Sequence, residues 1–372
     1  MFKLNVIDYG ILYENPLPQL RSRNGYFPSI VVLDDGTLLA SFAVGEAFES
    51  VDLTTVLSKS SDEGKTWTYL GPIYDKSRAD VAVSDFFKIT NAGGGRLIAF
   101  GYEYLRENSE LPIGNPETGG VLESRMVFLE SFDEGNTWDN ISLIPSTFAE
   151  PIEASAPITV LKNGTLVSPI ANFFNWDGQC SAGLHGRLLR TEDEGKTWDD
   201  SVITMEFPGR NTAIWEQRLC ELENGNLILI AWNEVLETGE RLPNHYVISK
   251  DGGRSFNKPL STGIMGQASN IMHIGDNKVL ALHCIRRDTD RPGIYGYIVD
   301  LAKGKWDILS KEIIWEPQVP VKADNSMAAV FAFLKFGQPS AVKLKDGNYL
   351  ITNWFVEDGR GKIAWHRLKI ED

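Results

Sequence analysis

The sequence has few cysteines, and they do not form a recognisable framework. Cys180, Cys220 and Cys284 are the only cysteines among 372 residues, and they lie far apart in the chain. Disulfide scaffolds and zinc sites need closely spaced clusters of cysteines, whereas isolated cysteines are most often small buried side chains. We therefore expect no metal site, and we also expect no cofactor.

Basic clusters and long apolar segments are missing as well. The formal charge is −14, and no run of Lys or Arg interrupts the acidic balance. Nucleic acids and anionic membranes bind basic surfaces, so we expect neither as a partner. No stretch reaches membrane-spanning length, and residues 1–8 lack the apolar region of a signal peptide. The sequence as given predicts a cytoplasmic protein, or an exported one if a leader has been removed.

A short pattern is abundant instead. The form Ser/Thr-x-Asp-x-Gly-x-Thr/Ser-aromatic occurs at residues 60–67, 131–138, 191–198 and 249–256. Its Asp and Ser/Thr oxygens can accept hydrogen bonds from turn amides, and its Gly supplies a positive φ. The copies lack the ligand count of a calcium loop. This eight-residue repeat therefore predicts structural hairpin turns, each packed onto its sheet by the closing Trp or Phe.

A second pattern alternates with the first. Apolar alternating segments flank an Asp/Asn-Gly turn, which is typical of a β-hairpin. Clear copies lie at 28–38, 157–166, 217–227 and 339–350, and weaker copies lie at 86–97 and 270–280. Each hairpin and the eight-residue repeat after it would supply four strands in blades one to four. In blade five the segment 296–306 replaces the repeat, and blade six ends at 363–370.

These patterns predict an all-β fold, a six-bladed β-propeller with four-stranded antiparallel blades. No linker or compositional break divides the chain, so we expect one domain over residues 1–372. The segment 4–13 is the expected strand that closes the ring and removes an exposed edge. The longer insertions 103–120 and 310–336 are expected to be loops over one rim, where recognition is common.

The eight-residue repeats resemble the Asp boxes, or BNR repeats, of the sialidase (neuraminidase) superfamily, and the resemblance covers nearly the whole chain. It implies a sialidase-like glycosidase of carbohydrate metabolism, although Asp-box propellers also include receptors and assembly factors. Glu216 matches the family's glutamate at the start of a strand that runs into an acidic-Gly hairpin. By the same resemblance the acid/base aspartate belongs to the loop 46–52, where Asp52 is favoured among three carboxylates.

Other family positions differ in this chain. The Arg-Ile-Pro motif of sialidases, whose Arg belongs to a three-arginine cluster for the substrate carboxylate, reads Tyr-Phe-Pro at 26–28. The second arginine is missing because the strand 227–232 ends in Trp, and Gln338 occupies the position of the nucleophilic Tyr. Candidates for the third arginine are Arg286, Arg287 and Arg291. We therefore do not expect the family mechanism on ordinary sialosides.

Inner strands of a propeller begin at one face of the channel, so polar residues just before each hairpin should converge there. The catalytic candidates are Glu216, Asp52, Asp80 and Glu153. The substrate-binding candidates are Arg23, Tyr26, Asp85, Arg210, Arg218, Asn270, His273, Arg286, Arg291 and Gln338. Trp176, Trp215 and Trp232 are candidates for stacking on a sugar. For each carboxylate except Glu216, a structural role in neutralising an arginine is at least an equal alternative.

A standard glycosidase uses two carboxylates, and Glu216 could pair with Asp52, Asp80, Asp85 or Glu153. Arginine suits the carboxylate or sulfate of an anionic sugar. The leading hypothesis is therefore an exo-acting, sialidase-like glycoside hydrolase with a carbohydrate substrate, a terminal and acidic sugar that need not be sialic acid. Two alternatives stay open: a polysaccharide lyase on a uronate, using a pair such as His273 and Tyr26, and a non-catalytic propeller that binds glycan or protein.

Overall fold

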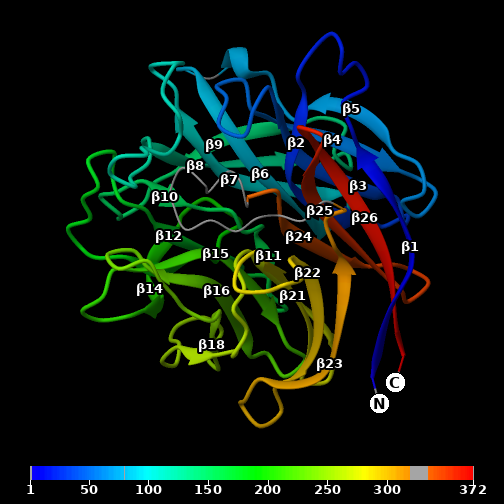
Figure 1. The fold of residues 1–372 in the computed structure, drawn as a ribbon, viewed down its shortest axis with the longest axis vertical. Coiled ribbons are helices and arrows are strands. Elements are labelled where there is room, and N and C mark those ends of the chain that lie inside the picture. The colour runs from blue at the N-terminus through cyan, green and yellow to red at the C-terminus, as the bar shows by residue number, and fades with distance from the viewer. Residues whose placement is uncertain (1, 79, 319–333, 372) are drawn as a thin grey trace.

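Six antiparallel sheets form a ring of blades in the computed structural model, which describes residues 2–78, 80–318 and 334–371 (Figure 1). Blade one contains β2 (Asn24–Val32), β3 (Leu38–Gly45), β4 (Thr54–Ser60) and β5 (Thr68–Pro72). Blade two contains β6 (Val83–Gly93), β7 (Arg96–Leu105), β8 (Ser124–Ser131) and β9 (Asp139–Ile144). Blade three contains β10 (Ile152–Glu153) and β11 (Thr159–Val160), which both pair with β12 (Leu166–Asn172), then β13 (His185–Thr191) and β14 (Asp199–Glu206).

The other three blades complete the ring. Blade four contains β15 (Thr212–Glu221), β16 (Leu227–Val235), β18 (His245–Ser249) and β19 (Leu260–Ser261), with β17 (Glu240–Arg241) paired to β16. Blade five contains β20 (Ser269–Gly275), β21 (Lys278–Ile285), β22 (Gly293–Asp300) and β23 (Asp307–Trp315). Blade six contains β24 (Phe336–Lys343), β25 (Tyr349–Glu357), β26 (Arg360–Glu371) and β1 (Lys3–Tyr13). Within the described residues the one helical segment is the short 3-10 helix η1 (Lys76–Arg78), so no helix there could cross a membrane.

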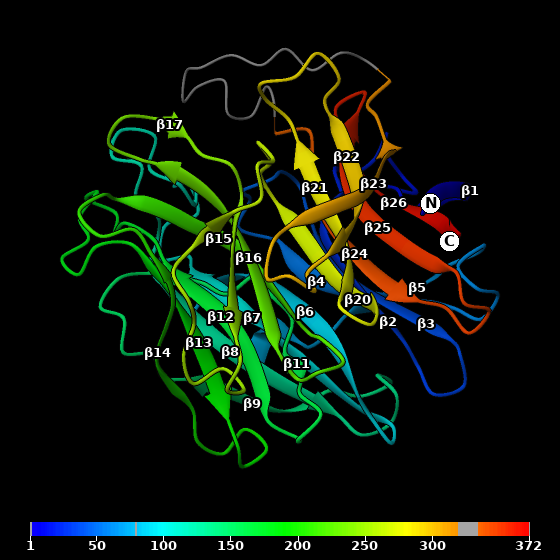
Figure 2. The same ribbon diagram turned by 90° about the horizontal axis from the view of Figure 1, so that it is seen from below.

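The predicted fold is confirmed, including the closure of the ring by the N-terminal strand. β1 pairs antiparallel with β26, so that Lys3 lies opposite Glu371 and Tyr13 lies opposite Ile363. The two ends of the chain therefore lie side by side (Figures 1 and 2). This pairing covers an edge of blade six that would otherwise be exposed. The assignment of residues 1–372 to one domain stays a prediction.

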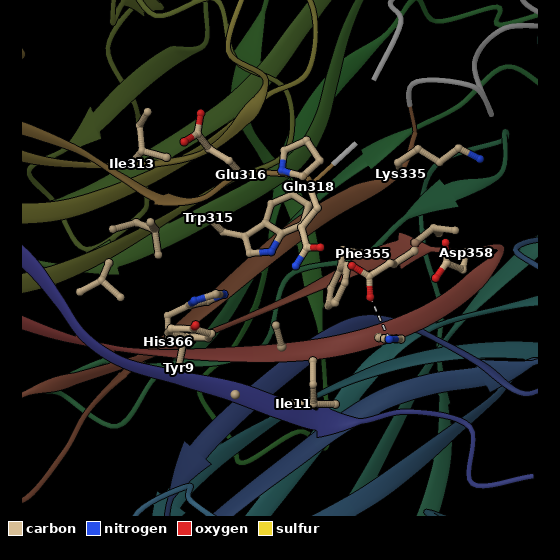
Figure 3. Close-up of a pocket in the computed structure, with 18 of the residues that line it drawn as sticks. Tyr9, Ile11, Ile313, Trp315, Glu316, Gln318, Lys335, Phe355, Asp358 and His366 are labelled. Carbon is tan, nitrogen blue, oxygen red and sulfur yellow. Dashed lines mark hydrogen bonds and ion pairs between the residues drawn. The ribbon is translucent and has the colours of Figure 1, made fainter. Parts of the chain in front are cut away.

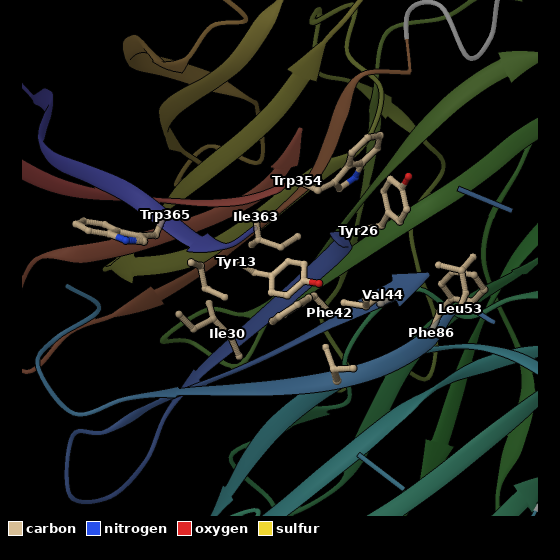
Figure 4. Close-up of a cluster of buried hydrophobic side chains, with 14 of the residues drawn as sticks. Tyr13, Tyr26, Ile30, Phe42, Val44, Leu53, Phe86, Trp354, Ile363 and Trp365 are labelled. Carbon is tan, nitrogen blue, oxygen red and sulfur yellow. The ribbon is translucent and has the colours of Figure 1, made fainter. Parts of the chain in front are cut away.

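Apolar packing supports the same closure. Tyr13, Phe42 and Ile363 come from β1, β3 and β26 and are buried in one cluster between blades six and one (Figure 4). The rings of Tyr13 and Phe42 have centroids 4.9 Å apart. Burial of such side chains contributes about 1.5–3 kcal/mol each. The ring is thus closed by side-chain packing as well as by the hydrogen bonds of the strand pair.

The eight-residue repeats form the predicted turns, each between the third and fourth strands of a blade. In the first copy Asp62 Oδ1 accepts a hydrogen bond from Thr66 N at 2.9 Å, and Gly64 N donates to Ser60 Oγ at 2.9 Å. Equivalent Asp contacts occur in the other copies, at Asp133, Asp193 and Asp251. The residue before the glycine also has a positive φ, as in Glu63 with a φ of 62°. The sequence pattern did not predict that second left-handed residue, because a glutamate gives no sign of a positive φ.

The two insertions differ from the expected loops at their ends. Residues 103–105 continue β7, and the rest of the first insertion forms a loop. The prediction of a loop is wrong for residues 310–315, which continue β23 and pair with β22. Long-range strand pairing extended both strands beyond the range that the sequence pattern suggested. Residues 319–333 of the second insertion lie outside the described residues.

Candidate functional site

A cavity of about 850 Å³ lies where the inner strands of the ring begin. Every blade contributes to its wall, through side chains that include Phe27, Tyr102, Glu153, Glu216, Arg286 and Gln338. Cavities that combine apolar walls with a few polar groups are the usual form of small-molecule sites. The cavity on the channel axis is therefore the candidate functional site.

Three bulges place side chains on the cavity wall. Phe27, Glu216 and Gln338 have φ values of 56°, 51° and 39°. Each lies within a register shift of its inner strand, in blades one, four and six. A bulge inserts an extra residue and redirects the neighbouring side chains. Left-handed backbone is costly for a residue other than glycine, and such strain is concentrated at functional sites.

Glu216 is the final acceptor in a chain of hydrogen bonds that begins at Lys88. Gln338 Nε2 donates to Glu216 Oε1 at 2.7 Å, and Lys88 Nζ donates to Gln338 Oε1 at 3.0 Å. Lys88 is 3% exposed, and this burial lowers its pKa well below 10.5. The positive charge of the nearby Arg218 lowers the pKa further. Lys88 is not among the site residues predicted from the sequence. A lone cation inside the apolar strand 86–89 was the available signal, because an unpaired lysine is rarely buried.

Glu153 and Arg218 form a buried cluster beside Glu216. Glu153 Oε1 accepts from Ser155 N at 3.0 Å, and its Oε2 is buried with no hydrogen-bond partner among the described residues. Burial raises the pKa of Glu153, and the nearby Arg218 opposes this shift. Arg218 Nη1 donates to Ser155 Oγ at 3.1 Å. Burial lowers the pKa of Arg218, while Glu153 and Glu216 act in the opposite direction.

Arg286 supplies a positive charge on the cavity wall. It is 3% exposed, and its Nε donates to Phe336 O at 2.7 Å. Within the part of the chain that the structure describes, no carboxylate forms an ion pair with Arg286. The other arginines of the wall are paired, Arg241 with Asp288 and Arg287 with Glu234. A buried guanidinium without a counterion is suited to an anionic ligand.

Aromatic side chains form most of the remaining wall. The rings of Trp215 and Trp232 make an edge contact with centroids 5.5 Å apart. The indole Nε1 atoms of Trp215 and Trp354 are buried without a hydrogen-bond partner among the described residues. Burial raises the pKa of Tyr102 well above 10.0. Trp176, the third predicted stacking residue, does not line the cavity.

The loop 46–52 does reach the cavity, through a different carboxylate from the favoured one. Asp52 is exposed, and its Oδ1 accepts from Glu46 N at 3.0 Å. Glu49 lines the cavity instead, and its Oε1 accepts from Gly114 N at 3.0 Å. Burial raises the pKa of Glu49. The sequence alone could not show which carboxylate of the loop turns inward.

Five further candidates do not border the cavity. Asp80 is 71% exposed and pairs with Arg125, whereas Asp85 is buried and pairs with Lys76 at 2.9 Å. The other three are surface arginines: Arg23 lies in an exposed segment, Arg210 pairs with Glu240, and Arg291 pairs with Glu316. The contacts that these residues make are therefore structural.

The residues of the predicted lyase pair are not brought together at the cavity. Tyr26 is buried and lies against Trp354 (Figure 4). Its ring also contacts that of Phe48. His273 lies at the turn end of β20, where its Nε2 is 2.9 Å from Asp276 O. Asn270 lies on the same strand and donates to Pro339 O at 2.9 Å. None of the three candidates, Tyr26, His273 and Asn270, lines the cavity.

A second hollow, of about 1170 Å³, lies between β23 and the strands β1, β25 and β26 of blade six (Figure 3). Its wall includes Tyr9, Trp315, Phe355 and His366, and it contains none of the predicted site residues. Within residues 2–78, 80–318 and 334–371, no group of three His, Cys, Asp or Glu side chains could hold a metal ion.

Comparison with known proteins gives structural matches only. The sequence matches no protein-family model and no curated protein. A crystal structure of a protein of unknown function from Dyadobacter fermentans has a TM-score of 0.77 and 20% identity, covering 99% of both chains. Penicillium chrysogenum α-L-arabinanase complexed with arabinobiose has a TM-score of 0.65 and 15% identity, covering 98% of both chains.

A sialidase is also among the structural matches. Trypanosoma rangeli sialidase in complex with the inhibitor DANA has a TM-score of 0.60 and 17% identity. The match covers 93% of this chain and 55% of that chain, so this chain spans about half the length of the sialidase. At such identities these matches show that the six-bladed fold is shared with proteins that include glycoside hydrolases.

Proposed function

We propose that this chain is a glycosidase that acts on a terminal, anionic sugar in the channel cavity, with Glu153 and Glu216 as its catalytic pair. The observation that carries the proposal is that both carboxylates line one cavity whose wall also holds Arg286, a buried cation without a counterion among the described residues. Solved propellers of similar fold include a sialidase and an arabinanase, which supports a carbohydrate substrate. We further propose that the chain is a divergent member of the sialidase superfamily.

The two carboxylates have different environments, which suits different roles. Burial raises the pKa of Glu153, so this group can hold a proton and donate it to the leaving oxygen. Its Oε2 has no partner among the described residues and is free to face that oxygen. Glu216 accepts a hydrogen bond from Gln338 and is assigned as the nucleophile or base.

The rest of the wall suits an anionic chain end. Arg286 would bind the carboxylate or sulfate of the sugar. The indole donors of Trp215 and Trp354, which have no partner among the described residues, would meet its oxygens, and the aromatic faces would cover its apolar face. Gln338 occupies the position that the family resemblance gives to a tyrosine nucleophile, and an uncharged amide is no nucleophile. The proposed reaction therefore uses carboxylates only.

The test is a panel of aryl glycosides and glycans, including uronides, sulfated sugars and sialosides, monitored for hydrolysis and for unsaturated products. We expect hydrolysis by the wild type and its loss in Glu216→Gln. The matched controls Asp52→Asn and Asp80→Asn remove carboxylates away from the cavity and should retain activity. An unsaturated product would instead support the lyase, and glycan binding without turnover would support the binding propeller. Either result would overturn the proposal.

A further inference from the structure

We propose that Lys88 is a positioning residue, which orients the amide of Gln338 and thereby holds the carboxylate of Glu216 for reaction. This inference rests on the proposed function and adds a part of its machinery. Lys88 lies on β6, Gln338 on β24 and Glu216 on β15, which belong to blades two, six and four. The hydrogen bonds thus connect side chains from three alternate blades across the channel.

The hydrogen-bond partners of Lys88 among the described residues are all acceptors. Its Nζ donates to Phe27 O at 2.6 Å, to Pro28 O at 3.4 Å and to Gln338 Oε1 at 3.0 Å. A lysine ammonium has three N–H donors and no acceptor, so these three oxygens match it fully. No carboxylate among the described residues forms an ion pair with Lys88. Its role is therefore to hold Gln338 and the bulge at Phe27 and Pro28.

This contact fixes which end of the Gln338 amide faces Glu216. With Oε1 turned to Lys88, Nε2 points to Glu216 Oε1 and donates to it at 2.7 Å. The flipped amide would place its NH₂ group against the ammonium and its oxygen against the carboxylate, which would make two repulsive contacts. Amide orientation is assigned from hydrogen-bond partners, and here both partners require the same orientation.

The consequence is that one oxygen of Glu216 is held and the other is left for the ligand. Glu216 lines the cavity, and its Oε2 has no hydrogen-bond partner among the described residues. The charged and titratable groups that interact with Glu216 are Lys88, Glu153, Arg218, Tyr102 and Cys284. Lys88 differs from the others because it also acts through the amide that Glu216 contacts.

The kinetic test compares Lys88→Met with a matched control. Loss of the correct carboxylate position should lower kcat by about 100-fold, with a much smaller change in KM. Lys162→Met is the control, because Lys162 Nζ also donates to two carbonyl oxygens, Leu222 O at 2.9 Å and Glu223 O at 2.7 Å, away from the cavity. Equal activities of the two variants would overturn the inference.

A second variant tests how a new charge at position 338 affects the ionisation of Glu216. Gln338→Glu places a carboxylate beside Glu216, and a like charge disfavours ionisation. The acidic limb of the kcat/KM profile should therefore move to higher pH. An unmoved limb would contradict the contact between residues 338 and 216. If Lys88→Met does not fold, this variant still tests the contact between Gln338 and Glu216 on which the inference depends.

A third measurement needs no turnover. The side-chain amide signals of Gln338 can be assigned by NMR as those lost in Gln338→Leu. We expect slow solvent exchange of these amide protons in the wild type and fast exchange in Lys88→Met. Unchanged exchange would overturn the role of Lys88 even if no substrate is found. If Lys88→Met loses the slow exchange but the wild type hydrolyses no glycoside, the positioning role of Lys88 is supported. That outcome contradicts only the proposed function.

Discussion

The guanidinium of Arg286 occupies the space in which a side chain at Gly337 would begin. Arg286 follows β21 in blade five, whereas Gly337 lies on β24 in blade six next to the bulge at Gln338. The Nε of Arg286 also donates to the carbonyl of Phe336, the residue before that glycine. The position of the cation is therefore set by the backbone of the neighbouring blade.

Removal of the Arg286 charge should weaken binding of an anionic sugar. A charge-assisted hydrogen bond contributes about 1.5–3 kcal/mol, so Arg286→Met should raise the Kd roughly 10- to 100-fold. Gly337→Ala should act in the same direction, because the new Cβ would displace the guanidinium. Calorimetric titration with the anionic sugar and a neutral analogue measures both effects. Arg291→Met is the control, since Arg291 is exposed and pairs with Glu316. A similar loss in this control would contradict the assignment.

Glu153→Gln should change the pH dependence of stability. Burial raises the pKa of Glu153 above 4.5, so its contribution to stability is present below that value and is lost as the pH rises through the raised pKa. A glutamine at position 153 does not ionise, so the variant does not lose stability in this way as the pH rises. The Tm of the variant relative to wild type, measured by calorimetry, should therefore increase between about pH 4, just below the usual glutamate pKa, and about pH 8. A difference that is constant with pH would contradict the burial of this carboxyl group.

The eight-residue turns should lose stability when their aspartate is replaced. Hydrogen bonds from Thr66 lower the pKa of Asp62 to about 2. The stabilisation is thus present above the usual aspartate pKa of 3.8 and is lost as the pH falls toward 2. Asp62→Ala should cost about 1 kcal/mol at neutral pH, and the loss should shrink in acid. Asp290→Asn, an exposed substitution, is the control in urea unfolding.

Gly101→Ala should displace the backbone of Phe86, whose side chain lines the cavity. A Cβ at Gly101 would overlap the carbonyl oxygen of Phe86, which is backbone and cannot turn aside. Overpacking of this kind costs about 1–3 kcal/mol. Gly114→Ala is the comparison, because its Cβ would meet only Glu49 Oε1 at 3.4 Å. Equal stability of the two variants in thermal unfolding would argue against the close approach of β6 and β7.

The sequence predicted the ring because the turn residues recur. Asp62 and its counterparts specify the hairpins locally, through hydrogen bonds within a few residues. The site could be predicted less well, because side-chain direction depends on bulges and on position along each strand. His273 precedes a hairpin in sequence order but lies at its turn end, near Asp276. Lys88 has partners 60 and 250 residues away, which no local pattern reveals.

The central claim is that Glu153 and Glu216 act as an acid and a nucleophile or base. The most direct measurement is hydrolysis of aryl glycosides with good and poor leaving groups by wild type, Glu153→Gln and Glu216→Gln. Glu216→Gln should lose activity on both substrates. Glu153→Gln should lose far more activity on the poor leaving group, because only that group needs a proton to depart. Equal losses for the two substrates in Glu153→Gln, or an absence of hydrolysis by the wild type, would contradict the account.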